Sequence, residues 1–190
     1  MCGIVGFTAK TWCPGPERIK QATGSLLHRG PDQQGVYQSA HCYLGATRLK
    51  IVDLSAGDQP IYSDNRDTAI VFNGEIYNHL EVRTTLESLG HRFQTHCDTE
   101  TVLHAFLEWD IDCFERLRGM FAIAIWCESR QRLILARDRV GIKPLYIAEQ
   151  GEDLFFGSKL KGILIHPEIE RRLSLKGLDC FLSMNYVPSP

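Results

Sequence analysis

The order of apolar and polar positions predicts a chain rich in strands, with helices in its first third, its middle and its last third. Short apolar runs bounded by turn residues are typical of strands, and we expect strands over 1–7, 43–53, 69–72, 120–126, 133–136 and 154–157. Apolar residues at helical spacing predict helices over 19–27, 79–89, a segment that starts at 98–100, 160–165 and 175–184. Strands after residue 119 follow one another across short polar turns, which favours antiparallel pairing. The pattern therefore predicts an α+β domain of sheets covered by helices, not a regular βαβ alternation.

Local signals mark several ends of these elements. Gly90 is a natural stop for the helix over 79–89, and Asp98 is a natural N-cap for the next helix. Asn73-Gly74 closes the apolar run over 69–72 and is a strong turn dipeptide, so a hairpin turn is expected there. The segment 55–60 contains serine, glycine and proline and is expected to be a loop.

Composition and charge narrow the classes of protein that fit. The chain has 190 residues, 44% of them hydrophobic and 23% charged, which is ordinary for one globular domain. The net charge is −2 and no basic stripe is present, which argues against a nucleic-acid partner. The sequence contains neither an apolar run of about 18 residues nor a signal peptide, so we expect a cytoplasmic protein without a membrane segment. Glycine-rich motifs for dinucleotides or nucleotide phosphates are also missing.

The cysteines and histidines indicate neither a disulfide framework nor a metal site. Seven cysteines are an odd number and show no CxxC spacing. The seven histidines form no HxxxH or HExxH pattern, and we expect no bound metal. Most of the cysteines are expected to be small buried side chains. Cys2 is the exception, because it becomes the first residue when Met1 is removed.

A cysteine at the N-terminus carries its own base. The free α-amine has an ordinary pKa near 7.7–8.0 and lies within one residue of a thiol whose ordinary pKa is near 8.5. The amine can therefore accept the thiol proton, as it does for N-terminal threonine nucleophiles. Taken alone this signal is weak, since many proteins carry a small residue after Met1.

Several further motifs occur in a fixed order along the chain. The blocks 1–7, 28–32, 73–78, 98–100 and 119–122 resemble the class II glutamine amidotransferase domain of the N-terminal nucleophile hydrolases. The blocks 48–54, 59–60, 136–146 and 186–188 are similar to those of glutamine-hydrolysing asparagine synthetases. The resemblance covers essentially the whole chain.

The resemblance implies a fold and a reaction. The fold would be a four-layer αββα sandwich, in which two antiparallel sheets are flanked by helices. In the reaction, the Cys2 thiolate would attack the side-chain amide of glutamine, release ammonia and leave a glutamyl thioester that water hydrolyses to glutamate. Asn73 and Gly74 match the positions of the oxyanion hole, which would use the asparagine amide and the glycine N–H. We expect these donors to be free because they lie in a turn.

Four charged residues match family positions at the glutamine pocket. The resemblance implies that Arg48 binds the α-carboxylate, that Glu75 and Asp98 face the α-ammonium, and that Arg29 borders the pocket. Each residue also has a simpler interpretation. Arg48 would be a solvated strand residue, Glu75 a surface charge, Asp98 a helix N-cap, and Arg29 an arginine that ties down its own turn.

The resemblance also implies partners. The amidotransferase domain would span 2–185, and 186–190 would begin a linker to a synthetase domain or subunit that receives the ammonia. This domain would need no cofactor, because ATP and magnesium are expected only in the missing synthetase domain. The partners would be L-glutamine and that synthetase, and a homodimer remains open. Lys159 departs from the family, which usually has an acidic residue there.

Three alternatives stay open. The domain could serve another ammonia acceptor, or it could sense glutamine without turnover. The chain could also be either a fragment or a free-standing glutaminase subunit.

Overall fold

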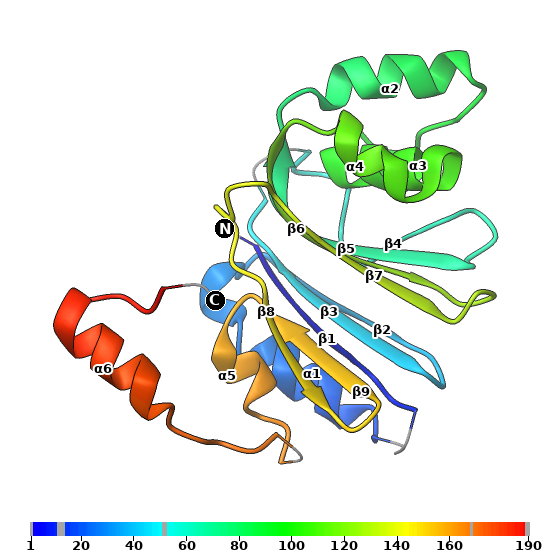
Figure 1. The fold of residues 1–190 in the computed structure, drawn as a ribbon. Coiled ribbons are helices and arrows are strands. Elements are labelled where there is room, and N and C mark those ends of the chain that lie inside the picture. The colour runs from blue at the N-terminus through cyan, green and yellow to red at the C-terminus, as the bar shows by residue number, and fades with distance from the viewer. Residues whose placement is uncertain (1, 11–13, 51–52, 168, 189–190) are drawn as a thin grey trace.

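Two antiparallel sheets form the centre of this computed structural model, which describes residues 2–10, 14–50, 53–167 and 169–188 (Figure 1). The first sheet has the strand order β2-β3-β1-β9-β8. Its strands are β1 (Gly3–Thr8), β2 (Gln33–Gln38), β3 (Cys42–Arg48), β8 (Tyr146–Gln150) and β9 (Asp153–Gly157). The second sheet has the order β4-β5-β6-β7. Its strands are β4 (Ile61–Tyr62), β5 (Thr68–Ile76), β6 (Gly119–Cys127) and β7 (Arg132–Arg137).

Helices cover the outer faces of both sheets. The 3₁₀ turns η1 and η2 span Leu27–Arg29 and Asp110–Asp112. The α-helices are α1 (Glu17–Gly24), α2 (His79–Ser88), α3 (Asp98–Trp109), α4 (Cys113–Arg116), α5 (Leu160–Ile163) and α6 (Leu175–Met184). Figure 1 shows α2, α3 and α4 on one side of the sheets, with α1 and α5 on the other.

Three buried clusters hold these layers together. Between the sheets, Ile4 and Leu44 pack against Val71 and Ala124. On the outer face of β5 and β6, the alternate residues Ile70 and Phe72 pack with residues of α2 and α3. The outer face of β1 packs on α1 through Val5, Phe7 and Ile19. The chain is therefore a helix, sheet, sheet, helix sandwich, and the expected fold class is confirmed.

The hairpin turn expected at Asn73-Gly74 is wrong. Strand β5 continues to Ile76 and pairs with β6 throughout, with Asn73 opposite Ala122 and Gly74 opposite Phe121. The chain leaves β5 through α2 and α3 before it returns as β6, so no tight turn forms. An added Cβ at Gly74 would lie 2.2 Å from the Met120 carbonyl oxygen, so glycine is needed here for the close approach of two strands.

The strand expected over 43–53 ends earlier, at Arg48. The Arg48 guanidinium donates to the carbonyl oxygens of Asp53 and Ala56 at 2.9 and 2.6 Å, which holds the loop over 53–56 beside the end of β3. Residues 51 and 52 lie outside the described residues. Strands β2, β4 and β8 are additional to the expected set.

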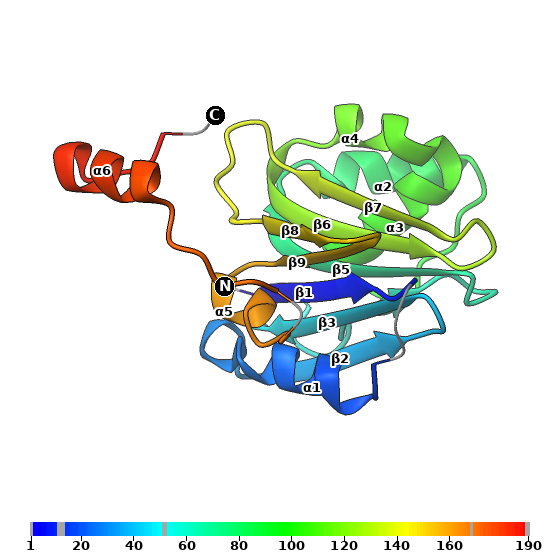
Figure 2. The ribbon, with the colours of Figure 1, turned by 60° about the horizontal axis from the view of Figure 1, so that its bottom comes forward.

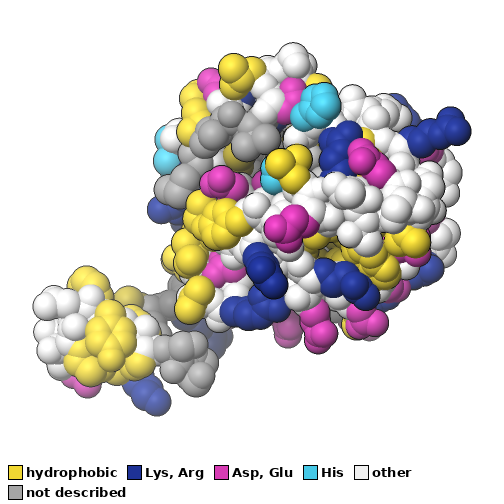
Figure 3. All heavy atoms as spheres, turned by 90° about the horizontal axis from the view of Figure 1, so that it is seen from above, with side chains coloured by type: hydrophobic (Ala, Val, Ile, Leu, Met, Phe, Trp, Pro, Cys, Tyr) yellow, Lys and Arg dark blue, Asp and Glu magenta, His cyan; other side chains and the backbone are white. Residues whose placement is uncertain are grey.

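Helix α6 stands apart from the rest of the structure. Figure 2 shows it at the end of an extended segment, separate from the two-sheet body. None of its residues is buried, and Leu182 is 73% exposed. Hydrophobic side chains lie on this separate part in Figure 3. Within the described residues, no helix combines the length and the apolar character that crossing a membrane requires.

Candidate active site

A pocket of about 150 Å³ lies where the ends of four strands, β1, β3, β5 and β6, meet the first turn of α3. Cys2 precedes β1, Arg48 ends β3, and Asp98 begins α3. Six of the seven residues expected at the site line this pocket: Cys2, Arg48, Asn73, Gly74, Glu75 and Asp98. Arg29 is the one that does not.

Cys2 is partly accessible and is held through its backbone. Its Sγ lies 3.8 Å from the carbonyl oxygen of Leu49. Its own carbonyl oxygen accepts a hydrogen bond from Nε of Arg29 at 2.9 Å. Arg29 is 8% exposed and, by this contact, binds the candidate nucleophile across 27 positions of sequence. Arg29 therefore contacts Cys2 as well as its own turn. It is not among the residues that line the pocket.

The backbone N–H of Gly74 points to the edge of β5 that faces away from β6. The N–H groups of Phe72 and Ile76 donate to the side chains of Gln59 and Asp98 on that edge, at 2.7 and 3.0 Å. Because strand orientation repeats every two residues, the N–H of Gly74 between them points the same way. The donor is therefore available to the pocket at a strand edge, without a turn.

Asn73 is held by a buried hydroxyl. Its side-chain Nδ2 donates to Oγ of Ser158 at 3.5 Å. The same oxygen accepts the backbone N–H of Ile4 at 3.0 Å, and the N–H of Ser158 donates to the Ile4 carbonyl at 2.8 Å. Ser158 therefore fixes the Asn73 amide relative to β1, which begins next to Cys2. Its neighbour Lys159, which departs from the family pattern, is exposed.

Arg48 is buried, so its interpretation as a solvated strand residue is wrong. It is 4% exposed, and Nη1 forms an ion pair with Oδ1 of Asp58 at 3.0 Å. Asp53, in the same loop, accepts the N–H of His96 at 2.8 Å. This hydrogen bond is the largest of the interactions that lower the pKa of Asp53 to about 2. The loop over 53–58 thus connects Arg48 to the segment that precedes α3.

Asp98 is a buried carboxylate in the first turn of α3, one position after the N-cap. It is 6% exposed, and its Oδ2 accepts the N–H of Ile76 at 3.0 Å. The N-cap position belongs to Cys97, which makes no capping hydrogen bond with its side chain. Burial raises the pKa of Asp98 above its ordinary value, because the charged form loses solvation. Glu75 also lines the pocket but is exposed, so the two carboxylates differ in their surroundings.

The remaining lining residues were not identified as site residues from the sequence: Leu49, Gln59, Phe72, Cys97, Thr99, Met120 and Lys143. Gln59 binds β5 as a neighbouring strand would. Its side chain accepts the N–H of Phe72 at 2.7 Å and donates to the carbonyl of Phe72 at 3.0 Å. Gln59 and Lys143 fall inside motif blocks that carry the resemblance, which was the available signal.

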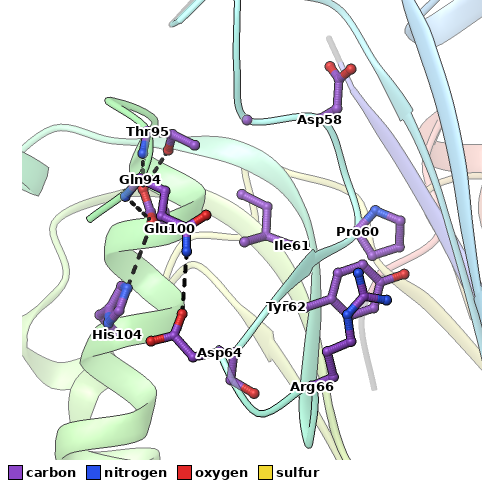
Figure 4. Close-up of a pocket in the computed structure, with 12 residues that line it drawn as sticks. Asp58, Pro60, Ile61, Tyr62, Asp64, Arg66, Gln94, Thr95, Glu100 and His104 are labelled. Carbon is purple, nitrogen blue, oxygen red and sulfur yellow. Dashed lines mark hydrogen bonds and ion pairs between the residues drawn. The ribbon is translucent and has the colours of Figure 1, made fainter. Parts of the chain in front are cut away.

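A second cavity, of about 340 Å³, lies beside this pocket and is shown in Figure 4. Asp58 and Pro60 line it, whereas Gln59 between them lines the first pocket. At its wall, Glu100 accepts the backbone N–H groups of Gln94 and Thr95, each at 2.7 Å. Burial opposes the charge of Glu100, but hydrogen bonds from His104 and from these two residues lower its pKa to about 2. Glu100 therefore braces the segment that leads into Asp98.

In the part of the chain that the structure describes, no group of three or more histidine, cysteine or acidic side chains could hold a metal ion. The described cysteines are free thiols, and Cys42, Cys97, Cys113 and Cys127 are buried. Of the two thiols that line the pocket, that of Cys2 is partly accessible and that of Cys97 is buried, and amide and backbone donors and fixed charges of both signs line the same pocket.

Comparisons with known proteins show the family to which the chain belongs. The family described as "Glutamine amidotransferase domain" matches residues 1–190. "Asparagine synthetase [glutamine-hydrolyzing] 3" of Bacillus subtilis (strain 168) is 40% identical over 94% of this chain and 30% of its own length. "Asparagine synthetase [glutamine-hydrolyzing] 1" of the same organism is 36% identical over 100% of this chain, again covering 30% of the relative. The chain thus spans about a third of these relatives.

A solved structure shows the same fold. Glutamine phosphoribosylpyrophosphate amidotransferase from B. subtilis, complexed with ADP and GMP, superposes with a TM-score of 0.73. The match covers 86% of this chain and 43% of that chain at 21% sequence identity. At this identity, the likeness is one of fold.

Proposed function

This chain belongs to the family of glutamine amidotransferase domains, and from that premise we propose that it hydrolyses the side-chain amide of glutamine and releases ammonia. The observation that carries the proposal is the pocket where Cys2 meets the Asn73 amide, the Gly74 edge and the buried Asp98. A nucleophile, two oxyanion donors and a charged recognition site are the parts that amide hydrolysis of an amino acid requires.

The reaction would start with the thiol of Cys2. In a chain that begins at Cys2, the α-amine accepts the thiol proton and the thiolate attacks the amide carbon of glutamine. The negative charge that develops on the carbonyl oxygen would be held by Nδ2 of Asn73 and N–H of Gly74. The α-ammonium then gives its proton to the amide nitrogen, and ammonia leaves as the thioester forms.

Water completes the cycle. The α-amine takes a proton from water as the oxygen attacks the thioester, and the proton returns to sulfur as glutamate forms. Arg29 would act as a positioning residue, because its contact is with the carbonyl of Cys2. Ser158 would do the same for the Asn73 amide.

Glutamine would be recognised by its two charged α-groups. Its ammonium would bind the buried Asp98, with Glu75 at the exposed rim. Its carboxylate would bind the guanidinium of Arg48, where it would join or replace the carboxylate of Asp58, the present ion-pair partner. These charges select a free amino acid over a glutamine side chain inside a protein.

The ammonia would pass to a synthetase domain or partner that forms an amide. The support is the 40% identity to a relative whose name is asparagine synthetase and of whose length this chain covers 30%. Activation of the acceptor by ATP would be the task of that other part.

The experiment is a glutaminase assay on the purified protein, with glutamate and ammonia measured together. We expect the two products in equal amounts, and we expect Cys2→Ala to abolish both while it still binds glutamine in calorimetry. Cys180→Ser, on the separate helix α6, is the matched thiol control and should keep full activity. Intact-mass spectrometry should show that the active protein begins at Cys2. Glutamate release by Cys2→Ala, or full activity in protein that retains Met1, would contradict the mechanism.

A further inference from the structure

Lys143 is a buried cation in the wall of the candidate active site. It is 6% exposed and lines the same pocket as Cys2 and Gly74. Among the described residues, its Nζ forms no hydrogen bond and no ion pair, and this includes the pocket carboxylates Asp98 and Glu75. The stem of the side chain is packed away while its Nζ stays open to the pocket, so its charge is available to an anion that arrives there.

The loop that carries Lys143 is firmly built. The Asp138 carboxylate accepts the N–H groups of Phe121, Ile142 and Lys143 at 3.2, 2.8 and 3.0 Å. From the other side, Nε of Arg137 donates to the Lys143 carbonyl at 2.7 Å. Three backbone donors on one carboxylate leave this loop little freedom. The 136–146 motif therefore has a structural task, which is to hold Lys143 in place against β6.

This placement brings Lys143 to the pocket from the side of β6. Oδ2 of Asp138 accepts the backbone N–H groups of both Phe121 and Lys143, so the backbones of these two residues are held against the same oxygen atom. Phe121 is the residue that pairs with Gly74 across β5 and β6. Arg48, by contrast, enters from the end of β3 and binds the loop over 53–58.

We propose that Lys143 is a catalytic residue of glutamine hydrolysis, whose ammonium stabilises the Cys2 thiolate and the oxyanion that forms beside Asn73 and Gly74. The inference rests on the proposed function and adds a third, charged donor to the two neutral ones. A fixed cation near a thiolate lowers the pKa of the thiol, and a donor at an oxyanion acts in the transition state more than in substrate binding.

The test compares Lys143→Met, which keeps the length of the side chain, with Lys143→Arg, which keeps the charge. Lys20→Met on the exposed face of α1 is the matched control. We expect Lys143→Met to lower kcat for glutamine by about 10–100-fold with little change in KM, and Lys143→Arg to recover part of the loss. The pH profile of Cys2 alkylation by iodoacetamide, followed by peptide mass spectrometry, should move to higher pH in Lys143→Met only.

Each outcome decides the inference. An unchanged kcat and an unchanged alkylation profile in Lys143→Met would overturn it. A loss of activity together with a lower unfolding temperature and an unchanged alkylation profile would overturn it too, because Lys143 would then only support its loop. Wild-type protein without glutaminase activity would contradict the proposed function instead, and the alkylation profile would still show whether Lys143 acts on Cys2.

Discussion

Replacing Asp98 by asparagine separates the charge of this side chain from its shape. In the present structure the backbone N of Ile76 lies 3.0 Å from Oδ2 of Asp98. The asparagine oxygen can still accept this N–H, so the local backbone keeps its hydrogen-bond partner. Only the negative charge that would face the α-ammonium of glutamine is removed. The structure therefore predicts opposite effects of Asp98→Asn on binding and on stability.

The loss in binding follows from the exchange of a charged acceptor for a neutral one. A hydrogen bond to a charged group contributes about 1.5–3 kcal/mol, against about 1 kcal/mol for a neutral one. Because Asp98 is 6% exposed, water can replace little of that interaction. We expect glutamine to bind about 10–100-fold more weakly, which corresponds to about 1.4–2.7 kcal/mol.

Stability should move the other way. Burial raises the pKa of Asp98, so at pH 7 its ionised form is more costly in the folded than in the unfolded chain. The neutral amide avoids this cost, and Asp98→Asn should unfold at the same or a higher temperature than the parent at pH 7. The difference should shrink as pH falls through the raised pKa of Asp98, where the parent becomes neutral as well.

The assay is calorimetric titration with glutamine in the Cys2→Ala background, which prevents turnover, together with thermal unfolding. Asp179→Asn, on the exposed helix α6, is the matched control and should change neither quantity. Unchanged glutamine affinity in Asp98→Asn would refute the reasoning. So would a loss of affinity that comes with a lower unfolding temperature, since Asp98 would then hold only the fold.

Three further predictions concern the surroundings of the pocket. Arg48→Lys should lower kcat/KM for glutamine by at least about tenfold in steady-state kinetics, because a point charge cannot reproduce the planar fork; equal kinetics would remove Arg48 from carboxylate binding. Ser158→Ala leaves the buried N–H of Ile4 without its acceptor, so denaturant unfolding should show a loss of about 1–3 kcal/mol, with lower kcat because Asn73 is released. Glu100→Gln should lower the free energy of unfolding by up to about 3 kcal/mol at pH 7, since the pKa of Glu100 is lowered from 4.5 to about 2. In unfolding experiments across pH, this loss should fade between about pH 4.5 and 2, and a loss that does not depend on pH would contradict the assignment.

The fold was predictable from sequence where burial follows a simple period. Apolar runs such as 120–126 lie inside β6, and the helix over 79–89 matches α2 within one residue. Strand β2 escaped because its sequence is QQGVYQ and it lies at a sheet edge, where few positions need to be apolar. The turn predicted at Asn73-Gly74 is wrong because the nine paired positions between β5 and β6 outweigh the local turn preference of this dipeptide.

The candidate site residues were predictable only where they lie in the motifs that carry the family resemblance. Sequence spacing could not show that Arg29 reaches the carbonyl of Cys2, because 27 positions separate them and the contact depends on tertiary packing. Lys143 was missed for a related reason. A lysine in a sequence is expected at the surface, whereas this one lies in the loop that Asp138 fixes and is 6% exposed.

The central claim is that Cys2 is the nucleophile for glutamine. The most direct measurement is covalent labelling with the glutamine analogue diazo-oxo-norleucine, followed by peptide mapping of all cysteines. Cys97 lines the same pocket and is an internal comparison, because burial raises the pKa of its thiol and keeps it protonated. The account predicts one label, on Cys2, that excess glutamine prevents. A label on Cys97, or labelling that glutamine does not suppress, would contradict it.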